Sequence, residues 1–221
     1  MAPNLRQPRV RRSVHAFSLI ELLVVILLVG VIAAIVLPAL AKSRQKAIAA
    51  ESLANSRAIG AAFKQYANDH DGALVPVNPV GKNAKANWAQ ELDQYDQANH
   101  RPAAAAAAGI GYNRRLSQVR RLDAIAQPAR TVAFGDTGQI VNPEERNPDR
   151  WREESSAKPQ VARLFETPAS NEWKTSRNRM VNRHLGRANV VFADGSAARM
   201  PVSRVGFQFE AGHARALWDS Q

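Results

Sequence analysis

Residues 15–41 read HAFSLIELLVVILLVGVIAAIVLPALA, and no other part of the chain holds so long an apolar run. Over residues 22–37 every residue is apolar or glycine, and Glu21 is the one charged residue of residues 17–41. A helix of roughly 20 apolar residues is long enough to span a bilayer. The apolar core of a cleaved secretory signal has only about 7–15 residues. We therefore expect a retained transmembrane helix over residues 17–41.

The carboxylate of Glu21 needs an explanation, because it stands at the head of this run just after four arginines. By insertion scales a charged side chain at the bilayer centre costs on the order of 2.5–3.5 kcal/mol. Near the membrane surface the cost is smaller, but it still favours a partner for the carboxylate. Two interpretations stay open. Either the partner is a free α-amine, made by cleavage just upstream or carried by a neighbouring subunit, or Glu21 is hydrated in the headgroup layer.

The sequence Ala-Phe-Ser-Leu-Ile-Glu at residues 16–21, followed by the apolar run and Pro38, resembles the class III signal of type IV pilins and type II secretion pseudopilins. The resemblance covers residues 9–41. It implies that residues 1–16 form a leader peptide, which a prepilin peptidase removes by cutting between Ala16 and Phe17. The family nearly always has glycine before the cut, where this chain has Ala16.

The same resemblance assigns roles to three residues of the mature chain. It implies N-methylation of Phe17, the new amino terminus. It implies that Glu21 serves assembly, because its carboxylate pairs with the amine of an adjacent subunit. Pro38 matches the proline that kinks the long helix of the family, and an internal proline is expected to kink a helix.

Location and partners follow from the resemblance more than from the charges. Four arginines precede the span, and Lys42, Arg44 and Lys46 follow it closely, so flanking charge does not decide the orientation. The resemblance implies a single-pass protein of the inner membrane, with its head in the periplasm or, after assembly, on the cell surface. It implies three partners: the prepilin peptidase, other pilin-like subunits and the inner-membrane assembly platform.

Beyond the span, residues 42–72 continue the helical pattern, and residues 73–221 form the expected head. Ile48, Ile59, Phe63 and Tyr66 share one helical face, so this amphipathic continuation is expected to pack on the head. The fold class we expect is α+β, in which one long N-terminal helix packs on a small antiparallel β-sheet, as in pilins.

Within the head, local patterns predict a few further elements. A short helix is expected in residues 87–97 and a strand in residues 131–134. Residues 102–109 form either a second helix, which we favour, or a low-complexity linker. Residues 142–168 are rich in Pro, Glu, Asn and Arg and are expected to be an exposed loop. Residues 188–200 are expected to form a hairpin, because an Asp-Gly pair between two strand-like runs is a strong turn signal.

The hairpin carries a second resemblance, in the sequence RHLGRANVVFADGSA at residues 183–197. His184 and the pair Asp194-Gly195 are separated by nine residues. This spacing is similar to the C-terminal motif of a large group of prepilin-like proteins. It implies a head like that of a pseudopilin.

Composition narrows the function further. The chain has no cysteine, so disulfides and thiolate metal sites are excluded. It has no nucleophile elbow or phosphate loop, and we expect no enzymatic activity. His184, Asp136 and Asp194 could form a metal site, but a purely structural turn at Asp194-Gly195 is the interpretation that we favour. We expect no metal or other cofactor, although a calcium site in the head stays open.

Two functions of different classes therefore remain. The first is a structural subunit that is cleaved, methylated and polymerised through its apolar helix into a pilus or pseudopilus-like filament. The second is a membrane-anchored binding protein whose basic head takes an acidic ligand, DNA or polysaccharide. Removing the leader takes away four arginines and no acidic residue, which lowers the formal charge from +11 to +7 and leaves the chain basic.

Overall fold

The computed structural model describes residues 18–76, 88–95, 109–154 and 164–220. The chain forms two compact units, Met1–Arg44 and Gln45–Gln221. The boundary between them falls inside one helix, α1 (Leu19–Asp69). The leader, Ala16 and Phe17 lie outside the described residues, as does nearly all of the helix predicted at 102–109.

Helix α1 has 51 residues and confirms the long N-terminal helix expected from the sequence. Pro38 lies inside it. Proline has no backbone N–H, so the helical hydrogen bond that a residue at this position would donate is missing.

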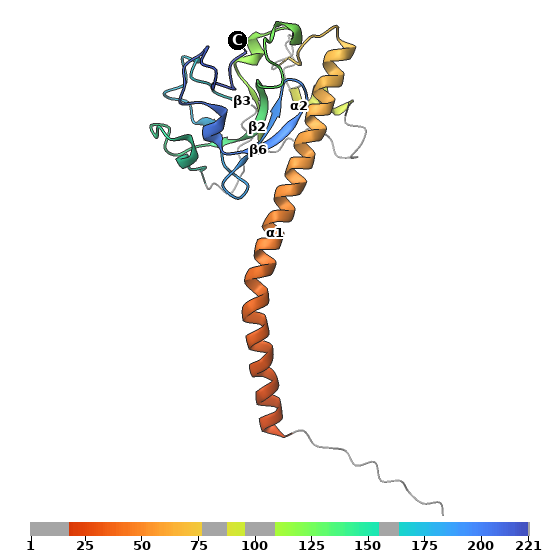
Figure 1. Cartoon of the computed structure of the whole chain (residues 1–221), viewed down its shortest axis with the longest axis vertical. Helices are drawn as coiled ribbons and strands as arrows, with labels where there is room; N and C mark the ends of the chain where they lie inside the picture. Colours follow the sequence, from red (N-terminus) through yellow and green to blue (C-terminus); the bar gives the residue numbers. More distant parts are fainter. Residues whose placement is uncertain (1–17, 77–87, 96–108, 155–163, 221) are drawn as a thin grey trace, which may run out of the picture. The chain divides into compact units, whose positions relative to one another are not determined.

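Among the described residues, the sheet of the second unit has six strands. Figure 1 shows it beside the second half of α1. Its order is β3-β1-β2-β5-β6, and β4 pairs with the far part of the long strand β2. Its strands are β1 (Ile110–Asn113), β2 (Val132–Gln139), β3 (Leu164–Phe165), β4 (Asn178–Met180), β5 (Ala188–Phe192) and β6 (Ala197–Met200).

A long helix with this sheet confirms the α+β class, and the sheet is antiparallel as expected except for one pairing. Strand β1 pairs with β3 in parallel, and the other four pairings are antiparallel. Antiparallel neighbours can be joined by a tight turn, whereas parallel ones need a connection of a dozen residues or more. The chain between β1 and β3 contains all of β2 and is long enough for this.

The predicted hairpin is confirmed as β5 and β6. Their register pairs Ala188 with Met200 and Val191 with Ala197. The strand predicted at residues 131–134 is present but longer, since β2 reaches Gln139.

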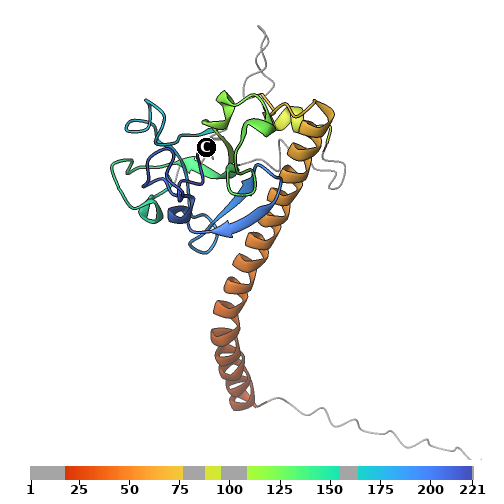
Figure 2. The same ribbon diagram turned by 45° about the horizontal axis from the view of Figure 1, so that its top comes forward.

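Two apolar clusters form the core of the head. In the first, the second half of α1 packs against the sheet and the short helix α2 (Trp88–Asp93) (Figure 2). Ile59, Phe63 and Tyr66 of α1 are buried there. The expectation for Ile48 is wrong, because 49% of its surface is exposed and its neighbour Ala49 is buried instead. Helix α2 confirms the helix predicted in residues 87–97.

The second cluster uses alternate residues of the same strands. Val190 of β5 belongs to it, while Val191 belongs to the first cluster, because successive side chains of a strand point to opposite faces. Trp151 and Phe165 are also buried in the second cluster. The exposed loop predicted at 142–168 is therefore wrong in part, and residues 155–163 of it lie outside the described residues. The described part of the head also contains four short 3-10 helices: η1 (Leu116–Gln118), η2 (Leu122–Ala124), η3 (Pro148–Arg150) and η4 (Val202–Val205).

Candidate functional site

The first candidate site is the apolar surface of α1. Every large apolar side chain from Leu19 to Leu40 is exposed, with fractions between 46% and 81%. Among the described helices, α1 alone is long and apolar enough to cross a membrane, and none of its most apolar window is buried within the protein. A helix that is hydrophobic on all sides needs lipid or other helices around it.

The residues along this surface leave room for a neighbouring helix. A Cβ atom added to Gly30 would meet no atom within 4 Å. Small residues let helix backbones approach closely in a membrane, where packing rather than the hydrophobic effect drives association. Gly30 and the Ala33-Ala34 pair are therefore candidate contact points between copies of the helix.

Glu21 lies in the first turn of α1 and has a partner in its own chain. Its Oε2 accepts a hydrogen bond of 2.9 Å from the backbone N–H of Ser18, and the Oγ of Ser18 accepts one of 3.4 Å from the N–H of Ile20. A Ser three residues before a Glu is the pattern of a capping box, which satisfies the free N–H groups at a helix start. Neither interpretation of Glu21 from the sequence included this local role.

The capping bond leaves acceptor positions of the Glu21 carboxylate available. An ionised carboxylate has about four acceptor positions, and the bond from Ser18 occupies one of them. Glu21 can therefore stabilise the helix start and still accept a hydrogen bond from an approaching amine. The capping bond also holds the side chain beside the first turn of the helix.

The second candidate site surrounds His184. Its Nε2 lies 3.7 Å from Oδ2 of Asp136 on β2, which is beyond hydrogen-bond distance. Asp194 stands beyond the other end of β5, where its Oδ1 accepts from the N–H and hydroxyl of Ser196. Of the three residues considered for a metal site, His184 and Asp136 therefore lie close together, whereas Asp194 belongs to the hairpin turn.

Asp136 belongs to a buried polar network that fastens α1 to the sheet. Its Oδ2 accepts a bond of 2.6 Å from the N–H of Asn189, and Asn189 Nδ2 donates to Oγ of Ser52 on α1 at 2.9 Å. Arg199 donates through Nε to Oδ1 of Asn189 and through Nη2 to the carbonyl of Ala49. These links lie within the second unit and hold the helix against β5 and β6.

Burial shifts the titration of both groups. It raises the pKa of Asp136 to about 6, although the bond from Asn189 and the charge of Arg183 work against this. Burial also lowers the pKa of His184, with help from the charges of Arg183 and Arg199. Near neutral pH the pair therefore consists of an ionised Asp136 and a neutral His184, rather than of two charges.

We predict that Asp136→Asn stabilises the head near pH 7. Because the pKa of Asp136 is higher in the folded protein, its contribution is most favourable below about pH 4 and is lost as pH rises through 6. A shift of about two pKa units corresponds to roughly 3 kcal/mol at most. Asparagine can still accept the Asn189 bond, so the variant should gain about 1–3 kcal/mol at pH 7 and little at pH 4. Urea unfolding followed by tryptophan fluorescence measures this.

The matched control is Asp149→Asn. Burial raises the pKa of Asp149, but hydrogen bonds from Ser203 and Asn182 outweigh it and leave the pKa lowered. Its contribution to stability has the opposite sign, since it is present at neutral pH and lost on acidification. The control should therefore not be more stable than the wild type at pH 7. If the wild type and Asp136→Asn were equally stable at pH 7, burial of the Asp136 carboxylate would not cost free energy, and the prediction would be wrong.

Gly195 of the hairpin motif meets α1 directly. Its φ is +87°, which side-chain-bearing residues rarely adopt, and a Cβ atom there would lie 2.8 Å from the carbonyl oxygen of Gly60. A Cβ on Gly60 would collide with the carbonyl oxygen of Gly195 and lie 2.9 Å from Cγ1 of Val191. The Asp-Gly turn thus works as the place where the hairpin docks on the helix, and glycine is required on both sides.

Sequence reasoning missed the partners of this docking: Gly60, Ser52, Asn189 and Arg199. A glycine in the middle of an amphipathic helix is a signal that could have pointed to close packing, whereas nothing in the local sequence marks the other three. Among the described residues, no group of three or more His, Asp or Glu side chains is arranged to hold a metal ion.

Comparison with known families supports the first candidate site. Residues 11–37 match the family model described as the prokaryotic N-terminal methylation motif, which is consistent with a type IV pilin-like signal. No curated protein and no solved structure matches the chain. Together with the exposed apolar helix, the motif indicates a single-pass membrane anchor.

Proposed function

We propose that the chain is a prepilin-like structural subunit, which assembles through its apolar helix into a type IV pilus or type II secretion pseudopilus-like filament. The observation that carries the proposal is the exposed apolar surface from Leu19 to Leu40. It holds Glu21 in its first turn, and residues 19–37 of it belong to the methylation motif. No cofactor is part of this proposal.

During assembly, the apolar part of α1 exchanges one environment for another. In the membrane, lipid chains cover the apolar side chains, and in a filament the same side chains are covered by other copies of the helix. Hydrophobic burial is thus nearly equal in the two states, so close packing and specific polar contacts decide between them. Glu21 is the polar group available for such a contact at the helix start.

Processing is the step that makes this contact available. In our proposal a prepilin peptidase cuts between Ala16 and Phe17, and Phe17 is then N-methylated. The new amine pairs with Glu21 of an adjacent subunit. The assembly platform in the inner membrane extracts the subunit, and the head resides in the periplasm or on the cell surface. The cap between Ser18 and Glu21 survives this cut, because both residues belong to the mature chain.

The proposal is tested by the chemistry of the mature amino terminus. Protein isolated from its host membranes should begin at Phe17 and carry one added methyl group, as measured by intact mass and by sequencing of the N-terminal peptide. The variant Ala16→Gly should be cut at the same bond, because it restores the residue usual in the family. A mature chain that starts at Met1, or one cut after Ala41, is incompatible with a prepilin.

The second candidate function, a basic head that binds an acidic ligand, is favoured by one observation. Three arginines line a single pocket of the head, and none of them has an acidic partner among the described residues. This function is compatible with the first, since a filament displays the heads of its subunits.

A further inference from the structure

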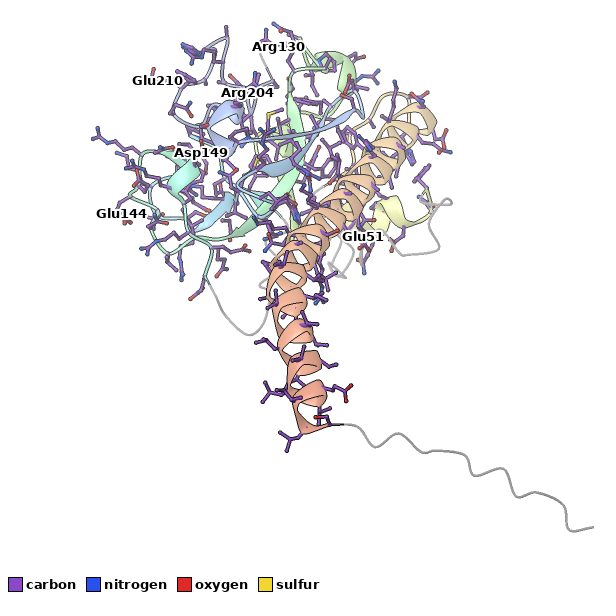
Figure 3. The ribbon with its side chains drawn as sticks, turned by 60° about the horizontal axis from the view of Figure 1, so that its bottom comes forward. Glu51, Arg130, Glu144, Asp149, Arg204 and Glu210 are labelled. Carbon is purple, nitrogen blue, oxygen red and sulfur yellow. The ribbon has the colours of Figure 1, made fainter. Side chains whose placement is uncertain are left out.

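Three arginines that are far apart in the sequence line one pocket of the head. They are Arg130, in the turn before β2, Arg204, in η4, and Arg215, near the C-terminus. The pocket has a volume of about 410 Å³ and is completed by Ser203, Gln208, Phe209 and Leu217. In Figure 3, Arg130 and Arg204 lie on the same part of the head, away from Glu51 on α1.

Backbone contacts hold the three segments together. The N–H of Val132 donates to the carbonyl of Leu217 at 2.6 Å, and the N–H of Leu217 donates to that of Val205 at 2.9 Å. Nη2 of Arg130 donates to the carbonyl of Ala214 at 2.9 Å. The C-terminal segment therefore runs between the start of β2 and η4, and the pocket is part of the folded head.

The described residues do not compensate the positive charge in this pocket. In the described part of the chain, no carboxylate lies within ion-pair distance of Arg130, Arg204 or Arg215. A second pocket shows the contrast, since its Arg114 pairs with Glu166 at 3.0 Å and its Arg115 with Asp219 at 3.2 Å. Arginines that share a concave site without counter-charges concentrate positive potential, which attracts anions.

The chemistry of the lining selects the kind of anion. Guanidinium groups bind oxyanions in a bidentate manner, and three of them can together donate to more oxygens than a carboxylate has. The ring of Phe209 is covered, because His213 stacks on it at 4.3 Å and the guanidinium of Arg215 lies 4.7 Å from its centroid. These two contacts compete with a nucleobase for stacking on this ring.

We propose that this pocket is a binding site for a tetrahedral oxyanion of the phosphate or sulfate class, either free or as the ester group of a small ligand. A volume of about 410 Å³ lies within the usual range of small-molecule sites, so an organic body attached to the oxyanion has room. This site is independent of the apolar helix and of filament assembly.

The test uses the full-length protein in a non-ionic detergent and isothermal titration calorimetry. Inorganic phosphate and glycerol 3-phosphate are the two probes, and acetate and chloride are compared with them at equal ionic strength. Both phosphate probes should bind saturably, at least tenfold more tightly than acetate. Tighter binding of glycerol 3-phosphate than of phosphate identifies an esterified ligand, and equal binding identifies the free ion. Equal binding of phosphate and acetate would overturn the site.

The variants separate this pocket from the general charge of the protein. The double variant Arg204→Gln, Arg215→Gln should bind phosphate at least tenfold more weakly. Arg204→Gln alone should weaken binding about threefold. It should not disturb folding, because the exposed side chain of Arg204 makes no hydrogen bond among the described residues. The matched control is Arg57→Gln with Arg187→Gln, which removes the same charge elsewhere and should bind as the wild type does. An equal loss of binding in the control, or no loss in the pocket variants, refutes the proposal.

Discussion

Replacing Gly60 by alanine is expected to lower the free energy of unfolding of the head by about 2 kcal/mol. Alanine normally stabilises the interior of a helix by roughly 0.5–1 kcal/mol relative to glycine. Here its Cβ would collide with the carbonyl oxygen of Gly195 and lie 2.9 Å from Cγ1 of Val191. Backbone atoms cannot rotate away, so the helix would have to move from the hairpin, and overpacking of this kind costs about 1–3 kcal/mol or more.

The partner glycine should show a still larger effect. Gly195→Ala places a side chain at a φ of +87° and 2.8 Å from the carbonyl oxygen of Gly60, so backbone strain adds to the collision. All four tryptophans of the chain lie in the head, at positions 88, 151, 173 and 218. Tryptophan fluorescence of the full-length protein in urea therefore reports on unfolding of the head alone.

Two further glycines provide matched controls. Gly30 is also helical, but a Cβ there would meet nothing within 4 Å, so Gly30→Ala should leave the urea midpoint of the head unchanged. Gly186 has a φ of +72° in open space, so Gly186→Ala carries the strain without the collision. Two results would contradict this interpretation: a Gly60→Ala head as stable as the wild type, or a Gly195→Ala head at least as stable as Gly186→Ala. Either would mean that the contact between hairpin and helix does not limit the free energy of unfolding.

Changing Glu21 to alanine is expected to abolish incorporation into filaments while membrane insertion continues. Insertion should become slightly easier, because the change removes a charge from an apolar helix. Assembly should fail, because the amine of the neighbouring subunit loses its counter-charge in a setting of low dielectric. Removing one member of such a pair leaves the other charge unpaired, at a cost of about 3–5 kcal/mol when the pair is buried. Filament content after shearing, or subunit cross-linking at equal membrane abundance, measures the loss.

The variant Glu21→Gln distinguishes the assembly role from the local cap. Glutamine can accept the bond from the N–H of Ser18 as glutamate does, but it has no charge. If Glu21 serves assembly through its charge, glutamine should fail as alanine does. Ser18→Ala is the complementary variant, since it removes the hydroxyl cap and keeps the carboxylate, and it should still assemble. Normal assembly of both Glu21 variants would leave the carboxylate with a structural role only.

The head shows where prediction from local sequence ends. The hairpin of β5 and β6 was predictable, because the Asp-Gly turn and its two flanking runs are adjacent in the chain. The parallel pairing of β1 with β3 was not, since more than 50 residues separate the partners Tyr112 and Leu164. The burial of Ile48 was predicted wrongly, because periodicity finds a helical face but does not show where the sheet ends beneath it.

The apolar helix, its glutamate and the methylation signal could be recognised from the sequence alone, because their physics is local. A run of apolar residues is hydrophobic wherever it lies, and a capping box needs only a serine and a glutamate three residues apart. The tertiary structure decided the rest: the packing of Gly60 on Gly195, the burial that raises the pKa of Asp136, and the gathering of Arg130, Arg204 and Arg215 in one pocket. Each of these depends on which distant segments the fold brings together, and that is set by the packing of the whole head rather than by neighbouring residues.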